Sequence, residues 1–71
     1  MAVPGLIEPL TARELQVLDL LAAGRPHQAI AAELVISLDT VKSHVAHIMG
    51  KLDAANRTQA VARARELGLL R

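Results

Sequence analysis

The residues whose side chains could do chemistry are concentrated between positions 39 and 51. They supply two hydroxyls, two imidazoles and two ammonium groups, from Thr40, Lys42, Ser43, His44, His47 and Lys51. All of these side chains can donate hydrogen bonds, and the two lysines carry a positive charge at neutral pH. Such a set suits contact with a negatively charged surface that accepts hydrogen bonds.

The sequence gives no comparable support for a catalytic site. The acidic residues Glu14, Asp19 and Glu33 are scattered, and no glycine-rich phosphate loop or nucleophile with a base occurs at motif spacing. A metal site at His44 and His47 would need neighbouring ligands that the sequence does not offer, and there is no cysteine. We therefore expect no enzymatic activity, cofactor, metal ion or small-molecule ligand.

The segment that carries the polar groups has the periodicity of an amphipathic helix. Val41, Val45, Ile48 and Leu52 recur at intervals of four, three and four, which places them on one stripe of a helix over residues 38–52. The other side carries short or polar residues: Asp39, Lys42, Ser43, Ala46, His47 and Gly50. This side could lie in a groove instead of against a core.

A shorter helix over about residues 27–34 precedes it. Pro26 is well placed to be the first residue of this helix, and Ser37 is expected to cap the next one. Val35 and Ile36 keep the intervening turn apolar, which predicts a turn tucked into the core. A short helix, a tight turn and a longer helix form a helix-turn-helix over about residues 27–46. Its second helix would be offered to DNA.

A first helix is predicted over residues 12–23. Thr11 and Glu14 have the spacing of a capping box, in which each side chain accepts a hydrogen bond from the backbone N–H of the other. Gly24 can adopt the left-handed conformation that ends a helix.

A last helix is predicted over residues 57–67, because Asn56 and Gln59 repeat the cap-and-reach-back spacing. The residues expected to face the other helices are Val61, Ala64 and Leu67. The four segments together predict an all-α fold, a compact four-helix bundle that contains the helix-turn-helix.

The chain of 71 residues is long enough for one small domain, expected over residues 9–70 after a linker at residues 1–8. No apolar run approaches the length of a membrane span and no signal peptide is recognised, so a soluble cytoplasmic protein is expected. Residues 1–38 carry a net charge of −2 and residues 39–71 a net charge of +3. The positive half begins at the helix expected to meet DNA.

Three segments together resemble the LuxR-type (LuxR/FixJ-like) helix-turn-helix domain. The matching motifs are Leu10-Thr11-x-Arg13-Glu14, Ile36-Ser37-x-x-Thr40-Val41-Lys42-x-His44-Val45 and Arg57-Thr58-Gln59-Ala60-Val61-Ala62. The likeness covers residues 8–70. The two ends of the chain look more like the large ATP-binding regulators of the MalT type than like response regulators.

The resemblance implies the C-terminal output domain of a bacterial transcriptional regulator that binds double-stranded DNA sequence-specifically. The third helix would enter the major groove, and the fourth would pair two copies on an inverted-repeat promoter site. Lys42 and Ser43 match the main contact positions of the family, and Ala46 matches one that is often basic. Ala62 and Arg65 are the candidates for the dimer contact, and RNA polymerase is a further candidate partner.

Some roles stay open at this stage. His44 and Lys51 could grip one phosphate strand, although a packed histidine is an equal reading, and His47 is a candidate for a groove or backbone contact. Thr40 could bond a phosphate or serve only in capping. A helical protein-interaction or dimerisation module that does not bind DNA is the alternative function.

Overall fold

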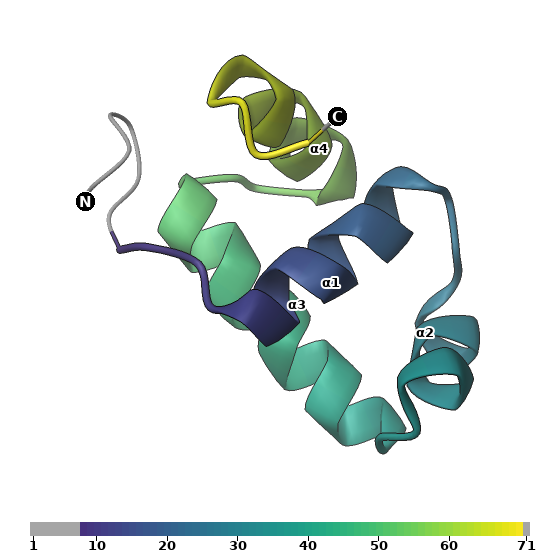
Figure 1. The fold of residues 1–71 in the computed structure, drawn as a ribbon. Coiled ribbons are helices and arrows are strands. Elements are labelled where there is room, and N and C mark those ends of the chain that lie inside the picture. Colours follow the sequence, from purple (N-terminus) through teal and green to yellow (C-terminus); the bar gives the residue numbers. More distant parts are fainter. Residues whose placement is uncertain (1–7, 71) are drawn as a thin grey trace.

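The computed structural model describes residues 8–70, and within this range the chain forms four helices and no strand (Figure 1). The helices are α1 (Ala12–Ala22), α2 (His27–Leu34), α3 (Leu38–Leu52) and α4 (Arg57–Glu66). Their ends fall within one residue of the predicted ones, so the all-α prediction is confirmed. The linker predicted at residues 1–8 lies almost wholly outside the described residues.

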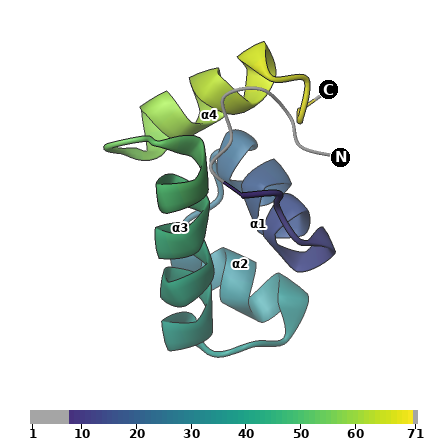
Figure 2. The same cartoon turned by 90° about the vertical axis from the view of Figure 1, so that its left-hand side faces the viewer.

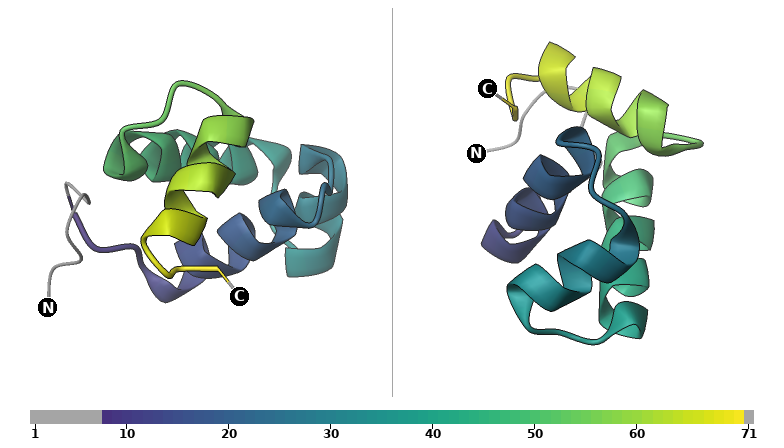
Figure 3. Two further views of the ribbon diagram at one scale, coloured as in Figure 1. Left: turned by 90° about the horizontal axis from the view of Figure 1, so that it is seen from above. Right: turned by 90° about the vertical axis from the view of Figure 1, so that its right-hand side faces the viewer.

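Helix α3 is the centre of the arrangement, because it packs against each of the other three helices. α2 lies near the start of α3 and α4 lies across its far end, while α1 crosses α3 and also contacts α4 (Figures 2 and 3). One side of α3 is therefore covered along its length. The opposite side has no neighbouring helix within the described part of the chain.

The helix starts follow from local hydrogen bonds. The Thr11 hydroxyl accepts from the Glu14 N–H at 3.1 Å and the Glu14 carboxylate accepts from the Thr11 N–H at 2.9 Å, which confirms the capping box. Ser37 caps α3 and Asn56 caps α4. Gln59 reaches back one residue further than predicted, because its side chain accepts from the N–H of Ala55.

The core is built from aliphatic residues of every helix. Its buried members are Val17, Leu18, Leu21, Ile30, Val41, Ile48, Leu52, Ala60 and Ala64. In α4 the fully buried residues are Ala60 and Ala64, whereas Val61 and Leu67 are partly buried. Ala64 and Leu67 pack on the core as predicted, and Ala60 is a further core residue that was not predicted. Small side chains allow α4 to approach α1 and α3 closely.

The turn of the helix-turn-helix differs from its prediction at two residues. Pro26 is the extended N-cap of α2, with ψ at 158°, and the helix begins at His27. Val35 is 89% exposed and has a left-handed backbone with φ at 56°, so it is not tucked into the core. Ile36 does pack against the core. The reversal between α2 and α3 requires the left-handed residue, and this turns the Val35 side chain to solvent.

Candidate nucleic-acid interface

The uncovered side of α3 is formed by six exposed residues, which we call the outer strip: Asp39, Lys42, Ser43, Ala46, His47 and Gly50. Behind it Val41, Ile48 and Leu52 are fully buried, as the stripe predicts, and Val45 is partly buried. Core packing thus fixes the rotation of α3 about its axis. The outer strip remains free to contact another molecule.

Lys42 is exposed and forms no hydrogen bond or ion pair within residues 8–70. Its ammonium is therefore available to an external anion. Thr40 is exposed as well, but its N–H donates to the Ser37 hydroxyl at 3.0 Å and the two hydroxyls lie 2.7 Å apart. Capping accounts for Thr40 in the free domain, so its hydroxyl is less available than that of Ser43.

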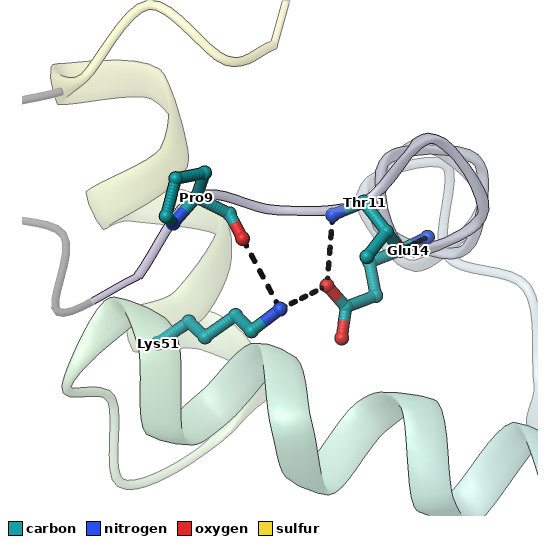
Figure 4. A network of polar contacts seen from close by, with 4 residues as sticks. All are labelled: Pro9, Thr11, Glu14 and Lys51. Atoms are coloured by element: carbon teal, nitrogen blue, oxygen red, sulfur yellow. Dashed lines mark hydrogen bonds and ion pairs between the residues drawn. The ribbon is translucent and has the colours of Figure 1, made fainter. Parts of the chain in front are cut away.

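Lys51 points away from the outer strip. Its Nζ lies 2.6 Å from the Glu14 carboxylate and donates to the carbonyl oxygen of Pro9 at 3.1 Å (Figure 4). Only 16% of the Lys51 side chain is exposed. The expectation that Lys51 grips a phosphate together with His44 is therefore not supported, because the ammonium is already satisfied inside the domain.

Glu14 is the buried partner of this pair. Burial acts to raise its pKa, but the hydrogen bonds from Lys51 and Thr11 and the charge of Lys51 outweigh burial and hold the Glu14 pKa below its ordinary value. Glu14 lies on the same helical stripe as Leu18 and Leu21. That spacing was a signal in the sequence that this carboxylate would be buried and would need a cation.

Arg57 is bonded to backbone carbonyl groups and does not pair with Glu14. Its guanidinium donates to the Leu21 carbonyl oxygen from Nε and Nη2, and to the Arg25 carbonyl oxygen from Nη2 at 2.6 Å. One of these carbonyl groups lies in the last turn of α1, where not every carbonyl has a partner within the helix, and the other lies in the loop between α1 and α2. Arg57 therefore joins α4 to α1 and is not a surface cation for DNA.

The two histidines of α3 share one hollow. His44 is half-buried and His47 is exposed, and both line a space of about 620 Å³ between α3 and the start of α1. Ala46 and Gly50 of the outer strip border the same space, and Glu8, Thr11, Glu14 and Lys51 complete it. The hollow therefore opens beside the surface that would meet DNA.

Gly50 lies in the interior of α3, although packing within the domain does not require a glycine there. A methyl group built at Gly50 would meet no other atom within 4 Å. Because glycine costs roughly 0.5–1 kcal/mol relative to alanine inside a helix, the fold alone would favour a larger residue. Internal crowding therefore does not explain the glycine at position 50. The remaining explanations are close contact with a partner and the nearness of the helix end.

The two residues predicted for dimer contact are both exposed on α4. Ala62 and Arg65 line one shallow hollow together with Leu21, Thr58 and Val61, between α1 and α4. This hollow is separate from the outer strip of α3, because the two share no residue. One copy could therefore contact DNA and a second copy at the same time.

Four short helices, a capped helix-turn-helix and an uncovered second helix define the class of small helix-turn-helix DNA-binding domains. The family model "Bacterial regulatory proteins, luxR family" matches residues 8–64. The chain belongs to this family, and it is a DNA-binding domain of a transcriptional regulator and not an enzyme. The alternative of an interaction module without DNA binding is not supported.

The relatives of this chain include response regulators. The chain is 47% identical over 57 residues to the transcriptional regulatory protein LiaR of Bacillus subtilis, covering 80% of this chain and 27% of LiaR. It is 45% identical over 65 residues to the response regulator VraR of Staphylococcus aureus, covering 92% of this chain and 31% of VraR. The chain thus spans about a third or less of these proteins, and the narrower likeness to MalT-type regulators is not supported.

Solved structures give the same fold. The response regulator ChrA of a heme-sensing two-component system superposes with a TM-score of 0.84 at 44% identity, covering 87% of this chain and 31% of ChrA. The transcription factor GerE superposes with a TM-score of 0.82 at 34% identity, covering 87% of this chain and 92% of GerE. Among the described residues no helix is long and apolar enough to cross a membrane, and no cluster of metal-ligating side chains occurs.

Proposed function

We propose that this domain places α3 in the major groove of double-stranded DNA, with the outer strip against the bases and Lys42 on a phosphate or a guanine edge. The observation that carries this proposal is the unpartnered, exposed Lys42 on the side of α3 that no helix covers. Phosphate contacts fix the position of a protein on DNA, and base contacts give the specificity. Ser43 and Ala46 lie in the middle of the outer strip, where base edges would be met.

The outer strip contains little specificity by itself. Ser43 can bond to almost any base edge, and Ala46 offers only a methyl group, which suits the methyl group of thymine. One copy therefore makes few contacts. We propose that two copies meet through α4 at Ala62 and Arg65 on an inverted-repeat promoter site in the bacterial cytoplasm, with RNA polymerase as a further partner.

The decisive variant is Lys42→Ala, with Lys42→Arg as its matched control. Loss of one phosphate contact should weaken binding to duplex DNA about three- to tenfold at low salt and reduce the slope of log K against log salt by about 1. Lys42→Arg keeps the charge and should keep both values near the parent. Both variants should remain folded, because Lys42 is exposed and has no partner within the described residues.

Fluorescence anisotropy of a labelled short duplex, titrated at several salt concentrations, measures both quantities. Equal affinity and equal salt slope for Lys42→Ala and the parent would show that DNA meets a different face. Sedimentation with and without the duplex checks that the mass gained is that of the DNA complex.

A further inference from the structure

The two flanks of the outer strip differ in the kind of cation that they carry. Lys42 and His47 are five residues apart, which places them roughly 140° apart around the helix axis. Lys42 is permanently charged at neutral pH, whereas the other flank carries His44 and His47. Lys51, the lysine on that second flank, is neutralised by Glu14.

We infer that the hollow beside α3 is a second binding site for the DNA backbone, in which His47 and His44 hold a phosphodiester and take up protons as they do so. This inference rests on the proposed placement of α3 in the groove. A helix in the major groove lies between two phosphate strands, so each flank faces one of them. The Lys42 flank would meet one strand with a fixed charge and the hollow would meet the other with titratable charge.

The size and lining of the hollow fit this ligand. Its volume of about 620 Å³ lies within the range of about 300–1,000 Å³ typical of ligand pockets. His47 is exposed at its edge and His44 is half-buried in its wall, so both imidazoles can donate to a phosphate that enters from the outer strip. Ala46 and Gly50 have no side chain long enough to obstruct that entry.

The other groups around the hollow do not supply a free cation. Glu14 and Lys51 neutralise each other at its base, and Thr11 adds only a hydroxyl that caps α1. Glu8, exposed on the N-terminal approach to α1, adds negative charge that opposes a phosphate. The positive charge that a phosphate requires must therefore come from the histidines. Protonated histidine donates from both ring nitrogens, and its charge change falls near neutral pH.

DNA binding should consequently strengthen as the pH falls. The complex holds more protons than the free domain, so by linkage a lower pH favours the complex. Each histidine that becomes fully protonated in the complex should tighten binding about three- to tenfold between about pH 7.5 and pH 6.0. Glu14 does not take up a proton in this range, because its pKa lies below its ordinary value.

The test compares the parent with His47→Gln, His44→Gln and the double variant, using anisotropy on one duplex at constant ionic strength across this pH range. The double variant should lose the pH dependence, and its affinity should fall furthest below that of the parent near pH 6.0. His27→Gln is the matched control, because His27 at the start of α2 does not line the hollow and the variant should keep the full dependence. Circular dichroism at each pH checks folding, and exposed His47 keeps the test usable if His44→Gln unfolds.

Three outcomes are distinguishable. Loss of pH dependence in the double variant but not in His27→Gln supports the phosphate site. A parent whose affinity does not change with pH, or a double variant that keeps the parent's dependence, overturns it. If the histidine variants overturn the phosphate site but Lys42→Ala still weakens DNA binding, the proposed function stands and only the second site is wrong. If neither Lys42→Ala nor the histidine variants change DNA binding, both proposals are wrong.

Discussion

At the scale of the residue, the ion pair between Glu14 and Lys51 shows how one lysine can belong to the fold and another to the interface. Both lie on α3, and both carry an ammonium group. Lys51 is held by a carboxylate whose side chain is 4% exposed, while Lys42 has no partner among the described residues. A buried pair gains Coulomb energy but loses solvation, so its net contribution is small. Removing only one partner is strongly destabilising, because it leaves the other charge buried and unpaired.

Lys51→Met should therefore lower the free energy of unfolding by about 3–5 kcal/mol, because the buried Glu14 carboxylate would lose its cation. Urea denaturation at neutral pH, followed by circular dichroism, measures the change. The double variant Glu14→Gln with Lys51→Met should recover part of the loss, since no buried charge remains. If Lys51→Met were as stable as the parent, the pair would be incidental.

Single residues also show which features the sequence could predict. The exposure of Lys42, Ser43 and Ala46 followed from helical periodicity, because the apolar stripe of α3 could face only one way. The partner of Lys51 did not follow, since Glu14 lies 37 positions earlier in the chain. Contacts of this kind depend on how α1 and α3 pack, and no spacing within α3 contains that information.

At the scale of the element, helix ends were predictable because capping is local. Thr11, Ser37 and Asn56 each accept from an N–H three residues later, so the sequence itself contains both donor and acceptor. The turn after α2 was not predictable in the same way. An apolar Val35 suggests burial, but the chain must reverse there, and the left-handed backbone that achieves this exposes the side chain.

Val35→Gly should therefore stabilise the domain. A left-handed backbone costs a non-glycine residue roughly 1–2 kcal/mol, and a β-branched residue is especially uncommon there. Valine at 89% exposure contributes little packing to offset this cost. After the greater freedom of glycine in the unfolded chain is counted, we expect a gain of about 0.5–1 kcal/mol and a melting temperature higher by a few degrees.

Asp53→Gly is the matched control for this prediction. Asp53 also has a left-handed backbone, with φ at 53°, at the end of α3. Aspartate tolerates this conformation better than valine does, so the same substitution should raise the melting temperature less. Thermal unfolding of both variants by circular dichroism decides the matter. An equal gain at the two positions would show that the shape of the valine side chain is not the cause.

At the scale of the whole molecule, the separation of the two exposed surfaces determines how the domain could achieve specificity. The outer strip offers one free lysine and few base contacts. Non-specific DNA binding through so few contacts typically has a dissociation constant of about 10⁻⁴ to 10⁻⁶ M. The hollow lined by Ala62 and Arg65 lies apart, between α1 and α4. Joining two copies there would add the contacts of both strips on one DNA duplex, and the second copy would bind at a raised effective concentration.

Ala62→Glu tests this arrangement at the level of the assembly. Ala62 is exposed, so a longer charged side chain should leave each copy folded while it obstructs the contact between copies. DNA sites that the parent binds are first selected from random duplexes. Affinities are then measured for a two-copy site, which binds two domains, and for its half-site, which binds one. We expect the parent's preference for the two-copy site to fall by about tenfold in the variant, with binding to the half-site nearly unchanged. Ala32→Glu, which adds the same charge at an exposed position on α2, should keep that preference. Equal losses for the two variants would mean that added negative charge weakens DNA binding generally, and that α4 is not where the copies meet.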